Sequence, residues 1–174
     1  IGYMLCIASV LFSFAHMLLM EGALRKKTAA FGRFLGASCI GGLAPAFLWL
    51  PAFLGLLGGR AKFDGNTANI LFNFNVLGLA GKLTAGSASP GQVVVGTPHI
   101  FCGMLVLFLV LLFFLNRAIA GKLRLTVLGV LAVIFLSFVL RPINIIWHGF
   151  SPNYAFNFRY AFIFSYVMIM AAQY

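Results

Sequence analysis

The sequence predicts an all-α fold, a polytopic transmembrane helical bundle, and its composition and charge pattern support this expectation. Of the 174 residues, 63% are hydrophobic and only 8% are charged, whereas soluble domains carry about 25% charged residues. Long stretches without any charge recur along the chain, and the charged residues gather between them. This composition excludes a disordered chain, a disulfide-stapled secreted domain and an ordinary water-soluble globule.

Five segments have the apolar character of membrane spans. A helix that crosses a bilayer needs about 20 largely apolar residues, with a range of about 17–25. The expected spans, in chain order, cover residues 1–20, 34–58, 100–116, 124–140 and 159–174. We therefore expect a single transmembrane domain over residues 1–174. Because the chain begins at Ile1 and ends inside an apolar run, we also expect it to be a segment of a longer polypeptide.

Basic residues are distributed unevenly between the segments that join these spans. Short cytoplasmic loops collect Lys and Arg. Most of the twelve basic residues lie in the two short connections, namely Arg25, Lys26, Lys27, Arg33, Arg117, Lys122 and Arg124. The long connections, about 59–99 and 141–158, are therefore expected to be extracytoplasmic. The basic excess is interpreted as a topology signal, and no nucleic-acid partner is expected.

The second expected span contains residues that affect how a helix packs. Ala37 and Gly41 are small residues four positions apart, and they offer a close-packing face to another helix. Pro45 and Pro51 each remove a backbone hydrogen bond and can bend a helix. We favour a bent packing helix over a gating hinge.

The densest polar cluster lies in the second long connection and at its end. Arg141, Trp147, His148, Asn153 and Arg159 occur there among further aromatic residues. Aromatic faces bind sugar rings, Arg binds phosphate through two parallel hydrogen bonds, and His exchanges protons near neutral pH. We interpret these five residues as a candidate substrate-binding site. The alternative is an ordinary belt of Trp and Tyr at headgroup level.

Other chemistry has little support in the sequence. The three histidines have no metal-ligand spacing, and the three cysteines form no CxxC pair, so no metal site is expected. No nucleotide-binding loop is visible, and no cofactor is expected. The only acidic residues, Glu21 and Asp64, leave an acid–base enzyme without its usual groups.

Several motifs of the chain resemble those of the YfhO family of bacterial membrane proteins. These proteins carry a WHGF-x-PN loop followed by a P-x-R-[YF]-S-F motif that leads into the next helix. The matching segments read IWHGFSPN at 146–153, FRYAFIFS at 158–165, GYML at 2–5, LWLPA at 48–52 and PHIFCG at 98–103. Asn157 and Ala161 depart from the pattern, since Pro and Ser are expected there.

The resemblance implies a function that the composition does not name. The family resembles the GT-C class of multi-spanning glycosyltransferases, which take a sugar from a polyprenyl-phosphate donor on the outer face. The implied acceptor is a cell-envelope polymer such as lipoteichoic acid, and the implied location is the bacterial cytoplasmic membrane. In that class the catalytic carboxylate lies in the first extracytoplasmic loop. This chain, as a GT-C-like core fragment, is expected to begin after that loop, so no catalytic residue is assigned.

Two other functions stay open at this point. A transporter or flippase for an anionic lipid-linked substrate is the first, and the bend-prone second span supports it. The absence of an internal sequence repeat counts against it, because many transporters are built from paired repeats. The second is a structural membrane subunit that only packs against partners within the lipid bilayer.

Overall fold

The computed structural model describes residues 2–47, 50–51, 54–55, 82–83, 98–148 and 158–174. Regular structure in these residues is helical and comprises six labelled helices. They are α1 (Gly2–Leu19), α2 (Leu24–Leu43), α6 (Met104–Leu115), α7 (Gly121–Val139), α8 (Arg141–Trp147) and α9 (Ala161–Ala172). The predicted all-α class is confirmed for this part of the chain. Most of the predicted connection 59–99, and Asn153, lie outside the described residues.

Two of the helices are long and apolar enough to cross a membrane. These are α1, with 18 residues, and α7, with 19 residues. They correspond to the spans expected at 1–20 and 124–140. The helices α6 and α9 are apolar but shorter, with 12 residues each. They lie inside the spans expected at 100–116 and 159–174, so the helical part of those segments is shorter than the apolar run.

The second expected span differs most from the structure. It was expected to begin near residue 34, but α2 begins at Leu24 and contains the basic residues that precede residue 34. Lys, Arg and Ala are strong helix formers, so a helix continues through a charged stretch that hydropathy places in a loop. The helix ends at Leu43, and a turn at Ala44 and Pro45 follows before helical backbone resumes at Ala46. The break agrees with the bend expected at Pro45.

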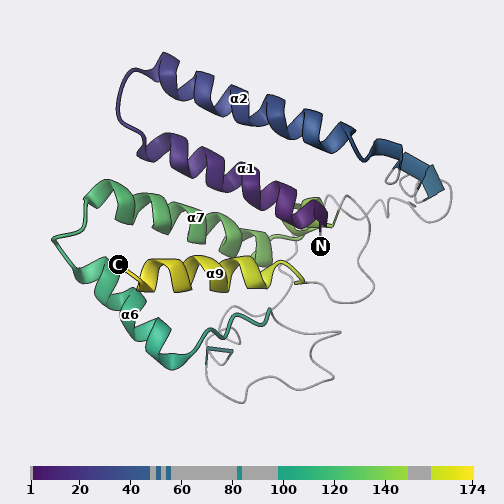
Figure 1. Cartoon of the computed structure of the whole chain (residues 1–174). Coiled ribbons are helices and arrows are strands. Elements are labelled where there is room, and N and C mark those ends of the chain that lie inside the picture. The colour runs from purple at the N-terminus through teal and green to yellow at the C-terminus, as the bar shows by residue number, and fades with distance from the viewer. Residues whose placement is uncertain (1, 48–49, 52–53, 56–81, 84–97, 149–157) are drawn as a thin grey trace.

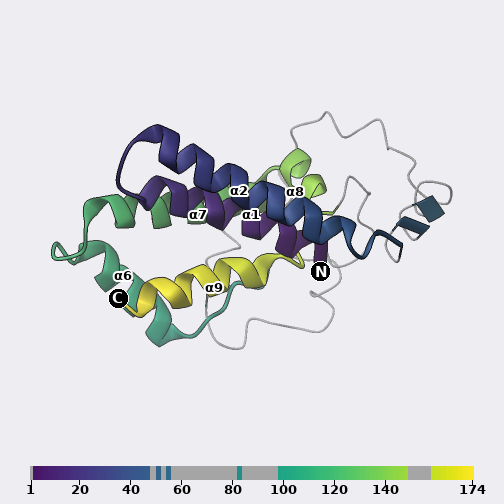
Figure 2. The ribbon, with the colours of Figure 1, turned by 45° about the horizontal axis from the view of Figure 1, so that its top comes forward.

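The helices pack side by side in the order α2, α1, α7, α9 and α6 (Figure 1). The turn between α1 and α2 reverses the chain at Gly22, whose φ of 111° is readily adopted only by glycine. The short helix α8 contacts α7 and α1, and Figure 2 shows it at the end of the bundle where the N-terminus lies. The helices α1 and α9 begin at one end of the bundle, and α7 ends at that same end (Figure 1). We call this end the α8 end, and we call the opposite end, with the α1–α2 turn, the basic end.

Buried apolar side chains form two clusters, one toward each end. The first joins α1, α7, α8 and α9 and includes Ile134, Phe138, Trp147 and Tyr160. The second joins α6 and α9 through Phe113 and Met168, among others. The helix α2 contributes no buried residue. A Cβ atom added at Gly41 would meet nothing within 4 Å, so the small-residue face of α2 is not packed against another described helix.

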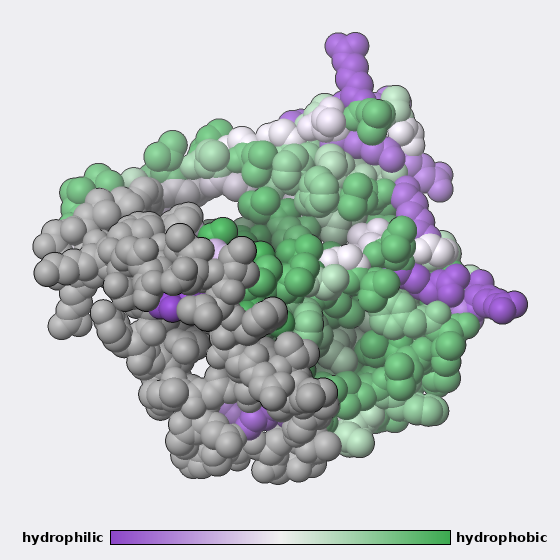
Figure 3. Space-filling view, turned by 180° about the vertical axis from the view of Figure 1, so that it is seen from behind, coloured by the Kyte–Doolittle hydropathy of each residue, from purple (hydrophilic) through white to green (hydrophobic). Residues whose placement is uncertain are grey.

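Apolar side chains also cover much of the outer surface. Figure 3 shows them over most of the visible described surface, with hydrophilic side chains gathered toward one end. On α6, for example, Leu105, Phe108 and Leu111 are all more than half exposed. Water-soluble monomers rarely expose apolar areas of this extent. A bilayer removes the cost of that exposure, so the surface is consistent with a membrane protein.

Two cations at the basic end bind helix C-termini. The ammonium of Lys122 donates to the carbonyl oxygens of Leu19, at 3.1 Å, and Met20, at 3.3 Å, at the end of α1. Arg124 donates from Nη1 to the carbonyl of Phe114 at 3.1 Å, near the end of α6. The last carbonyls of a helix lack intrahelical donors and carry partial negative charge. These two side chains therefore stabilise the two helix ends and connect α7 to both helices.

Candidate functional site

Tyr160 is the centre of the α8 end. Its side chain is fully buried, with 0% exposure. One face of its ring stacks on Trp147, with centroids 4.6 Å apart and planes 8° from parallel. Phe138 also stacks on this ring, at 5.1 Å and 25°. Offset aromatic pairs of this kind contribute about 0.5–1.5 kcal/mol beyond the area they bury. The stack therefore joins the end of α7, the end of α8 and the beginning of α9.

The hydroxyl group of Tyr160 completes this junction. It donates a hydrogen bond of 2.7 Å to the carbonyl oxygen of Ser137. Ser137 lies in the last turn of α7, where carbonyl groups have no intrahelical donor. The Ser137 hydroxyl in turn donates to the carbonyl of Val133 at 2.8 Å. A buried tyrosine from a distant part of the sequence thus caps α7 at its C-terminal end.

The short helix α8 differs from the sequence-based expectation, which is a loop from residue 141. Leu140 has an extended backbone conformation, which separates α8 from α7. Pro142 lies in the first turn of α8, where its missing N–H group costs nothing. A seven-residue helix is too short to give a hydropathy signal. Its consequence is that Asn144, Trp147 and His148 occupy defined positions.

His148 ends α8 and is oriented by the backbone. Its Nδ1 atom lies 2.9 Å from the carbonyl oxygen of Asn144, so this nitrogen carries the proton and donates it. The edge of its ring faces the ring of Tyr160, with centroids 6.0 Å apart. Asn144 itself is 7% exposed, and its side-chain Oδ1 has no hydrogen-bond partner among the described residues. The ring of His148 is therefore held in place against the aromatic stack.

The two candidate arginines lie on either side of this stack in the sequence. Arg141 is half-buried at the first residue of α8. Arg159 is exposed, between two anchored neighbours. Phe158 packs edge-on against Phe138 at 5.9 Å, and Tyr160 is the buried centre of the stack. The backbone of Arg159 is thereby held while its side chain reaches the surface.

Two further polar residues, Lys82 and His99, are not among the site residues expected from the sequence. Each is next in sequence to a residue of the same buried cluster. Lys82 is buried, and the adjacent Leu83 packs against the cluster that contains Trp147 and Tyr160. His99 precedes Ile100, a buried member of that cluster, and its Nε2 atom is buried without a partner among the described residues. Only the folded chain brings these segments together. The burial of these polar side chains beside apolar residues is the signal that identifies them, and it is not visible in the sequence.

The α8 end therefore collects basic and polar groups without a described carboxylate. Glu21 is the only acidic residue in the described part of the chain, and it lies beyond the opposite end of α1. Guanidinium and ammonium groups bind anions rather than cations. In the described residues no three His, Cys, Asp or Glu side chains are grouped to hold a metal ion. The chemistry of this end suits an anionic ligand.

Of the five residues proposed from the sequence, the structure places four at this end. Arg141, Trp147 and His148 belong to α8 or its end, and Arg159 precedes α9. Asn153 lies outside the described residues. Trp147 is 3% exposed and has one ring face occupied by Tyr160, so its indole serves as a wall of the cluster.

The comparisons with known proteins agree with the motifs of the sequence. A family model described as "Bacterial membrane protein YfhO" matches residues 1–174, the whole chain. No curated protein and no solved structure matches the chain. The match covers both the helices and the residues of the α8 end described above. The chain therefore belongs to the YfhO family of bacterial membrane proteins.

Proposed function

We propose that this protein is part of a polytopic membrane glycosyltransferase, and that the α8 end binds the phosphate of a polyprenyl-phosphate sugar donor. The proposed acceptor is a cell-envelope polymer such as lipoteichoic acid. In this proposal the α8 end faces outward and the basic end faces the cytoplasm, in keeping with the excess of Lys and Arg at the latter. The resemblance to GT-C enzymes supplies the reaction, and no catalytic base is assigned.

The single observation that carries the proposal is the gathering of basic side chains around one buried aromatic stack. Lys82 and Arg159 are each next in sequence to a residue of that cluster, Leu83 and Tyr160, and Arg141 begins the helix α8 that ends at Trp147 of the stack. The helices α1 and α9 begin at the same end (Figure 1). The N-termini of helices carry partial positive charge and add to the attraction for an anion.

Each residue has a distinct role in this proposal. Arg159, which is exposed, contacts the phosphate and stabilises the charge that develops as the sugar leaves. Arg141 contributes further donors, and His148 and Asn153 are kept as proposed ligands on the basis of the sequence motif. Trp147 positions His148 through the stack and does not touch the phosphate, because its side chain is buried.

The proposal is tested by replacing Arg159 with Ala and measuring glycosylation of the envelope polymer in cells. A matched control is Lys26→Ala, which removes an exposed cation at the opposite end of the bundle. We expect a loss of about 10²–10³ in the rate of modification for Arg159→Ala, the size of effect seen when one transition-state donor is removed. The control is expected to retain the activity. Unchanged modification in Arg159→Ala at normal protein levels would show that this site is not used.

A further inference from the structure

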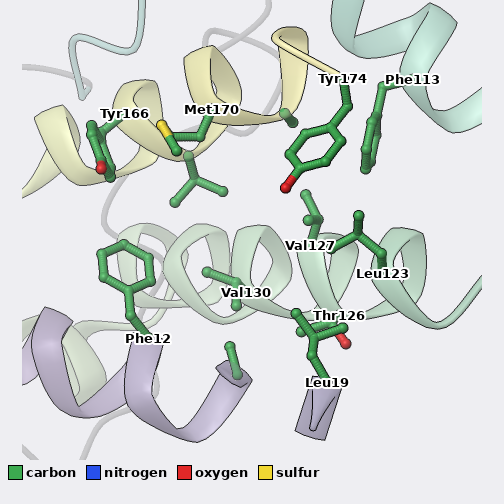
Figure 4. Close-up of a pocket in the computed structure, with 13 residues that line it drawn as sticks. Phe12, Leu19, Phe113, Leu123, Thr126, Val127, Val130, Tyr166, Met170 and Tyr174 are labelled. Atoms are coloured by element: carbon green, nitrogen blue, oxygen red, sulfur yellow. The ribbon is translucent and has the colours of Figure 1, made fainter. Parts of the chain in front are cut away.

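A second feature lies away from the α8 end, in the middle and basic end of the bundle. A cavity of about 350 Å³ lies between α1, α7 and α9, with a contribution from α6 (Figure 4). Val127 and Val130 of α7 lie between its two sides, with Phe12 and Leu19 of α1 on one side. Met170 of α9 lies on the other side. We call this cavity the α1–α9 groove.

The walls of the groove are almost entirely apolar. Polar side-chain atoms are limited to the hydroxyl groups of Thr126, Tyr166 and Tyr174. Water in an apolar groove is unfavourable, because the free energy gained by moving apolar surface out of water is then not realised. The natural occupant is therefore a hydrocarbon group.

The shape of the groove suits a single chain rather than a helix. The ring of Phe12, from α1, and the ring of Tyr166, from α9, meet across the groove with their centroids 6.2 Å apart. An α-helix with its side chains is about 10–12 Å wide and does not fit beneath such a contact. From Phe12 to Leu19, α1 rises about 10 Å, at about 1.5 Å per residue. A stretch of one acyl chain fills a groove of this length.

Cationic groups lie at the basic end of the groove. The ammonium of Lys122 is bound to the carbonyl of Leu19, a residue of the groove wall. That ammonium has three N–H donors and uses two of them on Leu19 and Met20, so one is left for an external acceptor. On the α6 side, Arg124 binds Phe114 through Nη1, and its Nε has no partner among the described residues.

We infer that the α1–α9 groove binds one acyl chain of an anionic phospholipid, whose phosphate is held by Lys122 at the basic end. The apolar walls select a lipid chain, and the cationic end selects a negative headgroup. Juxtamembrane Lys and Arg attract the anionic lipids of the cytoplasmic leaflet. This attraction is strong enough to favour an anionic headgroup over a neutral one. This site is separate from the α8 end and does not depend on the function proposed for it.

The test uses two neighbouring apolar residues of α9 that face different sides of the helix and are equally exposed. Met170 lines the groove and Ile169 does not, and both are 41% exposed. The purified protein in detergent is incubated with phosphatidylglycerol or phosphatidylcholine, and native mass spectrometry counts the retained lipid. Wild type is expected to retain one phosphatidylglycerol. Met170→Trp fills the groove and should weaken retention by about tenfold or more, a change of about one decade in Kd, whereas Ile169→Trp should retain the lipid as wild type does.

A second pair of variants tests the charge. Lys122→Gln keeps N–H donors for the α1 carbonyls but removes the positive charge, so it should reduce the preference for phosphatidylglycerol over phosphatidylcholine by about fivefold. Lys26→Gln, at the same end but not bound to the groove wall, should leave the preference unchanged. Wild type that retains no phospholipid, or equal retention by Met170→Trp and Ile169→Trp, would overturn the inference. So would a wild-type dimer that Met170→Trp dissociates, because the groove would then hold a second copy of the chain.

Discussion

Replacing Tyr160 with Phe is the sharpest test of how the α8 end is held together. The substitution keeps the ring and its stacking on Trp147 and Phe138, and removes only the hydroxyl group. That hydroxyl donates a 2.7 Å hydrogen bond to the carbonyl of Ser137 and is fully buried. Its loss leaves a buried acceptor at the end of α7 without a donor.

The expected cost follows from the asymmetry of buried hydrogen bonds. A hydrogen bond contributes a modest net free energy when made, but leaving one partner buried and unsatisfied costs about 1–3 kcal/mol. We therefore expect Tyr160→Phe to lower the free energy of unfolding by about 1–3 kcal/mol. The matched control is Tyr166→Phe, because Tyr166 is 52% exposed and its hydroxyl does not cap a helix. Its effect should stay within about 0.5 kcal/mol, as for most exposed substitutions.

The measurement is a reversible unfolding titration with SDS in mixed micelles, followed by circular dichroism. Both variants are compared with wild type at the same micelle composition. If Tyr160→Phe and Tyr166→Phe unfold at the same SDS fraction, the hydroxyl does not support α7, and the account of the junction is refuted. If Tyr160→Phe is destabilised but Arg159 still supports glycosylation, the cap serves stability and the site tolerates its loss.

Two more changes give results of predictable sign in the same assay. Gly103 precedes α6 with a φ of 102°, and an added Cβ would meet nothing there, so Gly103→Ala should lower the free energy of unfolding by about 1–3 kcal/mol through backbone strain alone. Gly129→Ala, at an equally open position inside α7, should instead raise it by about 0.5–1 kcal/mol. Trp147→Ala should cost about 3–5 kcal/mol because the indole is buried in the stack. Ile146→Ala, next to it and 41% exposed, should cost about 1 kcal/mol or less, and equal losses for the two would refute the burial argument.

Hydropathy located the long apolar helices. It did not locate the charged beginning of α2 or the short helix α8. The expected spans at 1–20 and 124–140 match α1 and α7 closely. The beginning of α2 at Leu24 was missed because helix propensity, unlike membrane insertion, does not penalise Lys and Arg. The helix α8 was missed because seven residues give no periodic signal that separates them from a loop.

The candidate site was predicted by residue type but not by arrangement. A motif that joins Trp147, His148 and Arg159 is visible in the sequence, since all three lie in one connection. The burial of Tyr160 between Phe138 and Trp147 depends on a contact between α7 and α9, which no local pattern encodes. For the same reason nothing in the local sequence around Lys82, far away along the chain, indicates that it is buried and that Leu83 packs against this cluster. Long-range packing decides which of the polar residues meet.

The cations at the two ends of the bundle lie next to different ends of helices. At the basic end Lys122 and Arg124 offset the partial negative charge of the carbonyls that end α1 and α6. At the α8 end, where α1 and α9 begin, Arg141 and Arg159 add to the partial positive charge of helix N-termini. The α7 carbonyl of Ser137 is there already bound by Tyr160.

A count of Lys and Arg treats these two groups alike, although Lys122 and Arg124 are bound to helix carbonyls. It follows that experiments on membrane orientation are better begun at Arg25 and Lys26, which are exposed, than at Lys122. Removing Lys122 would uncap α1 as well as change the loop charge, so a lower yield of protein would be mistaken for an altered topology.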